Sequence, residues 1–123
     1  MSLVLADTSV WVSHFRRTDP ILVRLLLNDQ VICHPLVLLE IACGTPPAPR
    51  QRTLEDLRLL RSATPATAEE ALTLIERERL QDQGCGAIDI LLLSAVLLTA
   101  DARLWTLDKP LAALAARLGV AFR

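Results

Sequence analysis

A short apolar run near the start of the chain, Leu3–Ala6, restricts the folds that the sequence can adopt. Its length and branched side chains are typical of a strand buried on both faces, as in a parallel sheet covered by helices. The run ends on Asp7, where open α/β sheets bind their ligands, outside the carboxyl ends of the strands. Thr8 and Ser9 then offer hydroxyls that can cap a helix beginning near Val10. For this segment alone, an aspartate that only caps a turn is the alternative.

Short apolar runs alternate with helical segments along the rest of the chain, an order that favours a mainly parallel sheet. We expect one α/β domain over residues 1–123, in which helices flank a small sheet. Besides the first strand, the pattern predicts strands at 31–33, 103–107 and 120–122. Helices are expected at 10–17, 20–27, 36–43, 50–61, 68–80, 87–98 and 110–118.

Composition and charge exclude several classes of protein. A hydrophobic fraction of 52% argues against disorder. The apolar runs are too short to span a bilayer and no signal segment opens the chain, so we expect a cytoplasmic protein with no membrane partner. The net charge of −1 gives no global attraction for nucleic acid. Any contact with a polyanion must therefore come from local clusters of charge.

The cysteines and histidines form no metal-binding or catalytic motif in the sequence. Cys33, Cys43 and Cys85 are odd in number and lack a paired metal-ligand spacing, so we expect buried small apolar residues and no disulfides or metal ligands. His14 and His34 have neither metal spacing nor a partnered nucleophile. They are interpreted as ordinary surface or strand-end residues.

Three further acids lie in strongly apolar surroundings. Glu40 and Asp89 each interrupt a helical segment that is otherwise apolar nearly all round, and Asp108 ends the apolar run 104–107. An ionised carboxylate left unpaired in such a place is costly or shifts its pKa. Each acid should therefore pair with an arginine, cap a helix, or share a partner with the others. Asp101 is a fifth candidate, but 99–101 has the composition of a polar turn.

A divalent cation is a partner that the acids can share: Asp7, Glu40, Asp89 and Asp108. Apolar segments supply no cation of their own, and oxygen ligands suit Mg²⁺ or Mn²⁺. Such an ion can orient a water, lower its pKa and neutralise a phosphate oxygen. In this interpretation the hydroxyls of Thr8, Ser9 and Thr106 hold carboxylates or waters in place.

With these residues assembled, the chain resembles the PIN-domain ribonucleases, specifically the toxins of VapBC-type toxin–antitoxin pairs. Residues 7–11 resemble the opening motif of that family, and Glu40 within 35–42 resembles its second acid. Asp89 with the apolar helix after it resembles the third acid, and 104–108 resemble the last motif with its preceding threonine. The resemblance runs through nearly the whole chain.

The resemblance implies a small parallel sheet flanked by helices and an acidic pocket that binds Mg²⁺ or Mn²⁺ and hydrolyses RNA phosphodiesters. It also implies a homodimer and a cognate antitoxin that lays a peptide into the active-site groove. Our leading interpretation is a metal-dependent endoribonuclease in which the four acids are ligands that position an attacking water. The rival is a non-catalytic α/β interaction module that keeps the fold and binds a partner protein only. The first candidates for RNA contact are Arg16, Arg17, Arg50 and Arg52.

Overall fold

Four parallel strands form the centre of the molecule, in the order β3-β2-β1-β4. The computed structural model describes residues 2–123. β1 pairs with β4 along its whole length, so that Ala6 lies opposite Trp105 and the two strands end side by side. The expected parallel sheet is therefore confirmed. The strands are β1 (Leu3–Ala6), β2 (Val31–Cys33), β3 (Arg61–Ser62) and β4 (Ala102–Trp105).

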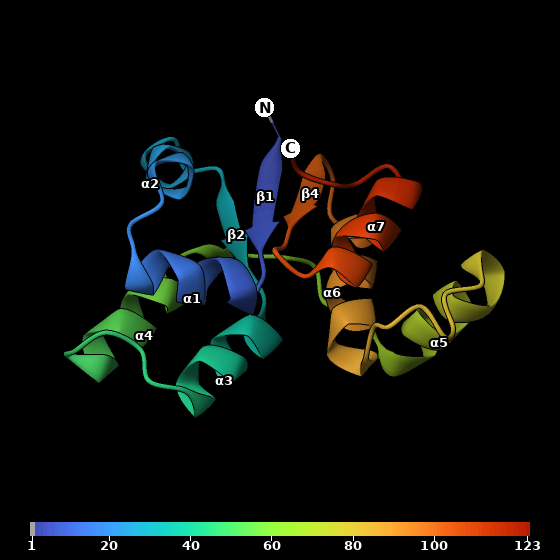
Figure 1. The fold of residues 1–123 in the computed structure, drawn as a ribbon, viewed down its shortest axis with the longest axis horizontal. Coiled ribbons are helices and arrows are strands. Elements are labelled where there is room, and N and C mark those ends of the chain that lie inside the picture. The colour runs from blue at the N-terminus through green and yellow to red at the C-terminus, as the bar shows by residue number, and fades with distance from the viewer. Residues whose placement is uncertain (1) are drawn as a thin grey trace.

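The helices of the described chain lie on both sides of the strands. In Figure 1, α1 to α4 lie to the left of β1 and α5 to α7 to its right. Right-handed crossovers produce this layout when the chain moves from β1 to β3 and then returns to β4. Within residues 2–123, no helix has both the length and the apolar character needed to cross a membrane. The helices are α1 (Thr8–Arg16), α2 (Pro20–Leu27), α3 (Pro35–Cys43), α4 (Arg50–Arg58), α5 (Ala68–Glu78), α6 (Ala87–Leu98) and α7 (Lys109–Arg117).

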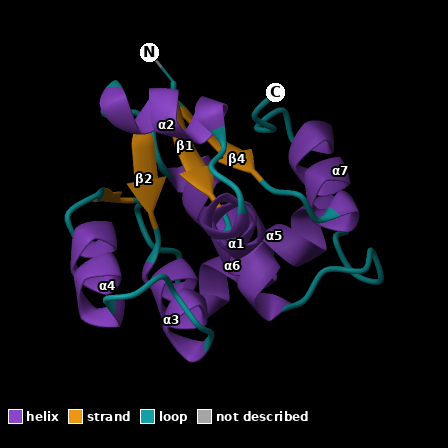
Figure 2. Cartoon of the chain, turned by 60° about the vertical axis from the view of Figure 1, so that its left-hand side comes forward, coloured by secondary structure: helices purple, strands orange, loops and turns teal. Residues whose placement is uncertain are grey.

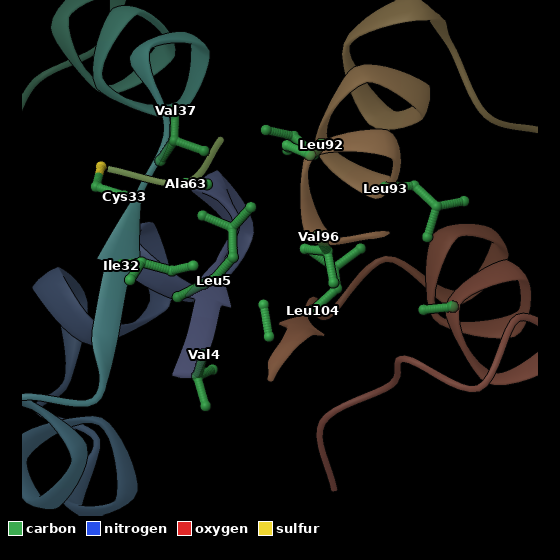
Figure 3. Packing of buried hydrophobic residues seen from close by; sticks show 14 of the residues in the cluster. Val4, Leu5, Ile32, Cys33, Val37, Ala63, Leu92, Leu93, Val96 and Leu104 are labelled. Atoms are coloured by element: carbon green, nitrogen blue, oxygen red, sulfur yellow. The ribbon is translucent and has the colours of Figure 1, made fainter. Parts of the chain in front are cut away.

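The core fixes the position of α6 against the strands. Leu5 of β1, Ile32 of β2 and Leu104 of β4 are fully buried. Figure 3 shows Val96 of α6 beside Leu104, and Leu92 of the same helix pointing toward the strands. Burying each such side chain contributes roughly 1.5–3 kcal/mol. Because the middle of α6 is held in this way, its first turn is carried to a defined place beside the ends of the strands.

The segment after α4 differs from the sequence prediction. α4 stops at Arg58, and Arg61–Ser62 forms β3, although the sequence predicts a helix as far as residue 61. Arg61 pairs opposite Ile32 of β2, the strand next to β3. Both residues of β3 are exposed and polar. They show neither the alternation of apolar and polar residues nor the apolar content that predicts a strand. These two residues adopt a strand conformation because they pair with the edge of β2 that β1 leaves free.

Other element boundaries also differ from the prediction. β4 ends at Trp105, before the predicted residue 107, and the predicted strand 120–122 contributes a single parallel bridge between Leu104 and Ala121. α1 begins at Thr8 and not near Val10, because Asp7 itself caps the helix. Thr8 and Ser9 therefore lie inside the first turn, where their hydroxyls are free to bind other side chains.

Candidate active site

The topology brings the four predicted acids to one end of the sheet. Asp7 follows β1 directly, and Asp108 ends the turn after β4. Glu40 lies on α3, the helix that follows β2, and Asp89 lies in the first turn of α6. Figure 2 shows the arrowheads of β1 and β2 pointing toward the end of the molecule where α1, α3 and α6 lie. Ligands of open α/β sheets bind at this end.

Asp7 is the most buried of these acids, with 6% of its surface exposed, and its carboxylate is held from two sides. Its Oδ1 accepts hydrogen bonds from the Ser9 hydroxyl at 2.5 Å and from the Val10 amide at 3.2 Å. Its Oδ2 accepts from the hydroxyl of Thr106, beyond the end of β4. The same Thr106 oxygen accepts from the Asp108 amide at 3.0 Å. One threonine therefore ties the first acid to the backbone of the last.

The hydroxyls at the start of α1 bind two different acids. Thr8 donates through Oγ1 to Oε1 of Glu40 at 2.6 Å, which links α1 to α3. Ser9 donates to Asp7 and also accepts from the Leu107 amide at 3.0 Å. Such bonds fix the orientation of a carboxylate and of the backbone around it.

Asp89 and Asp108 lie beside each other, with Cys85 as a common neighbour. One ligand atom from each of these three residues lies within 4.8 Å of the other two. Asp89 accepts through Oδ2 from the Gly86 amide at 3.3 Å, and Asp108 accepts through Oδ2 from the Leu111 amide at 3.1 Å. Each aspartate therefore contributes to capping at the start of its own helix, Asp108 as the N-cap residue of α7 and Asp89 as the acceptor for the N-cap amide of α6. Within residues 2–123, the second oxygen of each accepts no hydrogen bond.

Basic side chains do not neutralise these acids. In the part of the chain that the structure describes, the ion pairs join Arg61 to Asp29 and Arg77 to Glu78. Pairing of the four acids with arginines, one of the alternatives from the sequence, is therefore wrong. Helix capping, the other alternative, is confirmed for three of the four. A cap uses only part of the hydrogen-bonding capacity of a carboxylate.

Burial and neighbouring negative charge both act on Asp89. Burial raises the pKa of the Asp89 carboxyl from its ordinary value of 3.8, and the hydrogen bond from the Gly86 amide opposes that rise. Three neighbouring negative charges raise this pKa further, those of Asp108, Asp7 and Glu40. The four acids therefore form one negatively charged cluster, although they come from distant parts of the chain.

The cysteines differ from the sequence expectation. All three are free thiols; Cys33 is buried, Cys43 is exposed and Cys85 is half-buried. Burial as a small apolar residue is therefore confirmed for Cys33 and wrong for the other two. Cys85 lies beside the acids, a position that the sequence analysis did not predict. The one available signal was that Cys85 stands immediately before Gly86, the N-cap residue of the helix that carries Asp89.

Asp101 and the histidines lie apart from the acids. Asp101 is an exposed turn residue with φ of 58°, and its carbonyl accepts from the Leu3 amide at 2.8 Å. It therefore lies at the amino ends of β1 and β4, opposite the cluster, and its interpretation as a turn is confirmed. His34 is a strand-end residue as expected, buried after β2, where its Nδ1 accepts from the Leu36 amide at 3.0 Å. His14 lies half-buried on α1.

The arginines proposed as RNA contacts are exposed but differ in their surroundings. Arg16 and Glu40 both line a hollow of about 560 Å³ beside the acids. Arg50 donates to the carbonyls of Ala42 at 2.6 Å and Gly44 at 3.3 Å, which closes the end of α3. Within residues 2–123, Arg50 is the only one of the four arginines whose side chain forms a hydrogen bond. The four arginines are Arg16, Arg17, Arg50 and Arg52.

The donor chemistry of the cluster fits a hard divalent cation. The carboxylates supply oxygen ligands and carry excess negative charge, and hydroxyls hold two of them in place. Mg²⁺ and Mn²⁺ prefer such oxygen ligands. The residues that would hold the ion are Asp7, Glu40, Asp89 and Asp108.

Comparison with known proteins assigns this arrangement to a class. The family model of the PIN domain matches residues 4–117, a range that includes all four acids. The chain belongs to the PIN-domain family.

A more specific likeness lies within that family. The chain is 45% identical over 119 residues to a protein named Ribonuclease VapC32, found in two strains of Mycobacterium tuberculosis. The match covers 97% of this chain and 95% of the relative. The likeness to VapC-type toxins that the motifs indicate is thereby confirmed.

A solved structure supports the fold. The crystal structure of PAE2754 from Pyrobaculum aerophilum matches 96% of this chain and 90% of its own, with a TM-score of 0.58. Its sequence identity to this chain is 16%, so the likeness concerns the fold alone.

Proposed function

We propose that this protein is a metal-dependent endoribonuclease, the toxin of a toxin–antitoxin pair, which hydrolyses RNA phosphodiester bonds. The observation that carries the proposal is the meeting, at the carboxyl ends of the sheet, of four carboxylates that form no ion pair within residues 2–123. The relative named as a ribonuclease supports RNA as the substrate class. When bound, Mg²⁺ or Mn²⁺ would supply a Lewis acid that activates water and neutralises phosphate charge.

The protein's own hydroxyl groups hold the metal-binding carboxylates in a fixed orientation before a cation binds. Ser9 and Thr106 engage both oxygens of Asp7, and Thr8 engages one oxygen of Glu40. Side chains already fixed in this way lose little further entropy when they take up a ligand. We therefore assign these three hydroxyls a positioning role and the four acids the catalytic one.

RNA must approach a cluster that is itself negatively charged, so positive charge is needed nearby. Arg16 is the best placed of the four arginines, because it shares a hollow with Glu40. Arg50 already binds two carbonyls at the end of α3. We propose RNA contacts for both and for Arg17 and Arg52, with the strongest effect expected at Arg16.

The proposal includes the partners that the family likeness suggests. The relative is a VapC protein, and the sequence motifs resemble toxins that work with an antitoxin. We accordingly propose a cognate antitoxin that binds at the active-site groove, a homodimer, and action in the cytoplasm, where the RNA would be.

The test is cleavage of a mixed pool of RNA by the wild-type protein with Mg²⁺ or Mn²⁺ and with a chelator. We expect cleavage only with the cation, and its loss in Asp7→Asn and Glu40→Gln. Asp101→Asn is the matched control, because it removes an acid from the opposite end of the sheet. This variant should cleave RNA as the wild type does.

The rival interpretation, a module that only binds a partner protein, predicts a different result. The metal-loaded wild type would then leave RNA intact although it binds the cation. That outcome, or equal cleavage by the wild type and Asp7→Asn, would overturn the proposed function.

A further inference from the structure

The loop between α5 and α6 carries a thiol to the acidic cluster. Cys85 is half-buried and free, and it directly precedes Gly86, the residue that caps α6. Its Sγ and one carboxylate oxygen each of Asp89 and Asp108 lie within 4.8 Å of one another. The cluster therefore contains a sulfur donor beside its oxygen donors.

The backbone of the loop explains this placement. Gly84 has φ of 81°, a left-handed conformation that favours glycine. A Cβ at Gly84 would lie 3.4 Å from the side chain of Pro110, in the first turn of α7. The loop thus packs against the start of α7, where Asp108 is the cap. The carboxylate of Asp89 turns back toward Gly86, the residue that follows Cys85.

Redox chemistry does not account for a thiol in this position. Burial raises the pKa of the Cys85 thiol, and the charges of Asp89 and Asp108 raise it further. Thiols are readily oxidised or act as nucleophiles when their pKa is lowered, usually by a nearby positive charge. Cys85 lies instead beside two carboxylates, which are themselves cation ligands, so a bound cation is the partner that suits all three groups.

Sulfur changes which cation the site prefers. Mg²⁺ and Mn²⁺ favour oxygen ligands, whereas Zn²⁺ and Cd²⁺ also bind thiolate sulfur strongly. Zn²⁺ commonly takes three protein ligands and a water. Cys85 with Asp89 and Asp108 offers such a set of three.

We propose that Cys85, Asp89 and Asp108 form a binding site for a thiophilic divalent cation, with Zn²⁺ as the natural occupant, and that this cation competes with Mg²⁺ or Mn²⁺. On binding, the sulfur–hydrogen bond of Cys85 breaks, a metal–sulfur bond forms and the proton passes to solvent, with no change in oxidation state. The competition rests on the proposed function, because it assumes that Asp89 and Asp108 also hold the catalytic cation. Zn²⁺ therefore inhibits RNA cleavage.

The thiol is tested by titrating Cd²⁺ into the full-length protein and recording the ultraviolet charge-transfer absorption of a cadmium–thiolate bond. Wild type should develop this band, and Cys85→Ser should not. Cys43→Ser is the matched control, because Cys43 is an exposed cysteine at the end of α3. This variant should retain the band. Competition with a chromophoric chelator should show that Cys85→Ser weakens Zn²⁺ binding by at least about tenfold.

Mn²⁺ binding, followed by electron paramagnetic resonance, separates this inference from the proposed function. Cys85→Ser should leave the Mn²⁺ affinity unchanged and make cleavage resistant to Zn²⁺. A band that persists in both Cys85→Ser and Cys85→Ala, or an unchanged Zn²⁺ affinity, would overturn the thiol site. If the wild type shows the band but neither binds Mn²⁺ nor cleaves RNA, the thiol site stands and the proposed function fails.

Discussion

Asp89 is the residue at which burial and neighbouring charge act most clearly together. Its pKa is raised by burial, lowered by the Gly86 amide and raised again by Asp108, Asp7 and Glu40. A carboxyl whose pKa is higher in the folded chain makes the fold less stable as pH climbs from the unfolded pKa toward the folded one. The metal-free protein thus carries a penalty at neutral pH that a cation or the loss of one charge would relieve.

We therefore expect Asp89→Asn to leave the metal-free protein as stable as wild type, or more stable, at neutral pH. Asparagine can still accept the hydrogen bond from the Gly86 amide, so the cap of α6 is kept. Any gain in the free energy of unfolding relative to wild type should disappear as pH falls to about 4, because the Asp89 carboxyl of the unfolded wild type also becomes protonated there. Urea unfolding in a chelator at both pH values measures the difference.

The same variant should lose RNA cleavage with Mg²⁺ or Mn²⁺. A metal-free stability loss of about 3–5 kcal/mol would point to a broken buried ion pair, which is contrary to the structure. Retained cleavage would remove Asp89 from the set of catalytic residues.

Thr106 provides a second test at a single residue. Its hydroxyl donates to Asp7 and accepts from the Asp108 amide, so Thr106→Val leaves an acceptor and a donor without their partner. We expect a loss of about 1–3 kcal/mol in the free energy of unfolding and weaker Mn²⁺ binding. Thr106→Ser keeps the hydroxyl and should retain most of the wild-type stability and most of the Mn²⁺ affinity. Equal Mn²⁺ affinity in all three proteins would show that the hydroxyl does not position the ligands.

At the level of elements, α1 connects the acids to the proposed RNA contacts. Its first turn carries Thr8 and Ser9, which bind Glu40 and Asp7, and its last turn ends on Arg16. A helix of nine residues is about 13 Å long, so the two ends lie close enough to contact the same RNA strand.

Replacing both arginines at the end of α1, Arg16→Ala with Arg17→Ala, should weaken RNA binding with little change in folding. Each lost phosphate contact reduces the slope of log affinity against log salt concentration by about one unit. Arg77→Ala is the control, because Arg77 is an exposed arginine on α5, across the sheet from α1. Binding measured from low to high salt gives both slopes. An unchanged slope in the double variant would leave Arg16 and Arg17 as solvated surface charge.

At the level of the whole molecule, the cluster exists only when the chain is folded. Its four acids lie just after β1, on α3, on α6 and just before α7, which are segments far apart in the sequence. A cation that binds the assembled cluster and not the unfolded chain therefore stabilises the fold.

Mg²⁺ or Mn²⁺ should raise the melting temperature, whereas NaCl of equal ionic strength should not. At ten times the dissociation constant the gain is roughly 1.4 kcal/mol, which corresponds to a shift of a few degrees. Asp101→Asn should show the same shift as wild type, and Asp89→Asn a smaller one. Scanning calorimetry at increasing cation concentration measures the melting temperature. If Mg²⁺ or Mn²⁺ shifts it no more than NaCl does, the result would count against a cation in this cluster.

Much of the architecture follows from the sequence alone. Leu3–Ala6 reads as a buried strand because branched apolar side chains in a short run suit a sheet covered on both faces. Because strands alternate with helices, parallel pairing follows, and with it the meeting of strand ends at one edge. Asp7 and Asp108 can be placed there from sequence, since each directly follows an apolar run.

The partners of these residues were decided only by the tertiary structure. Thr106 binds Asp7 across 99 positions of sequence because β1 and β4 pair in one particular register. Arg61–Ser62 becomes β3 because β2 offers a free edge, not because of its own composition. Cys85 reaches the cluster because the loop before α6 packs on Pro110. Local patterns in sequence report which surfaces become buried, but hydrogen bonds and charge contacts between distant segments depend on how the elements are packed.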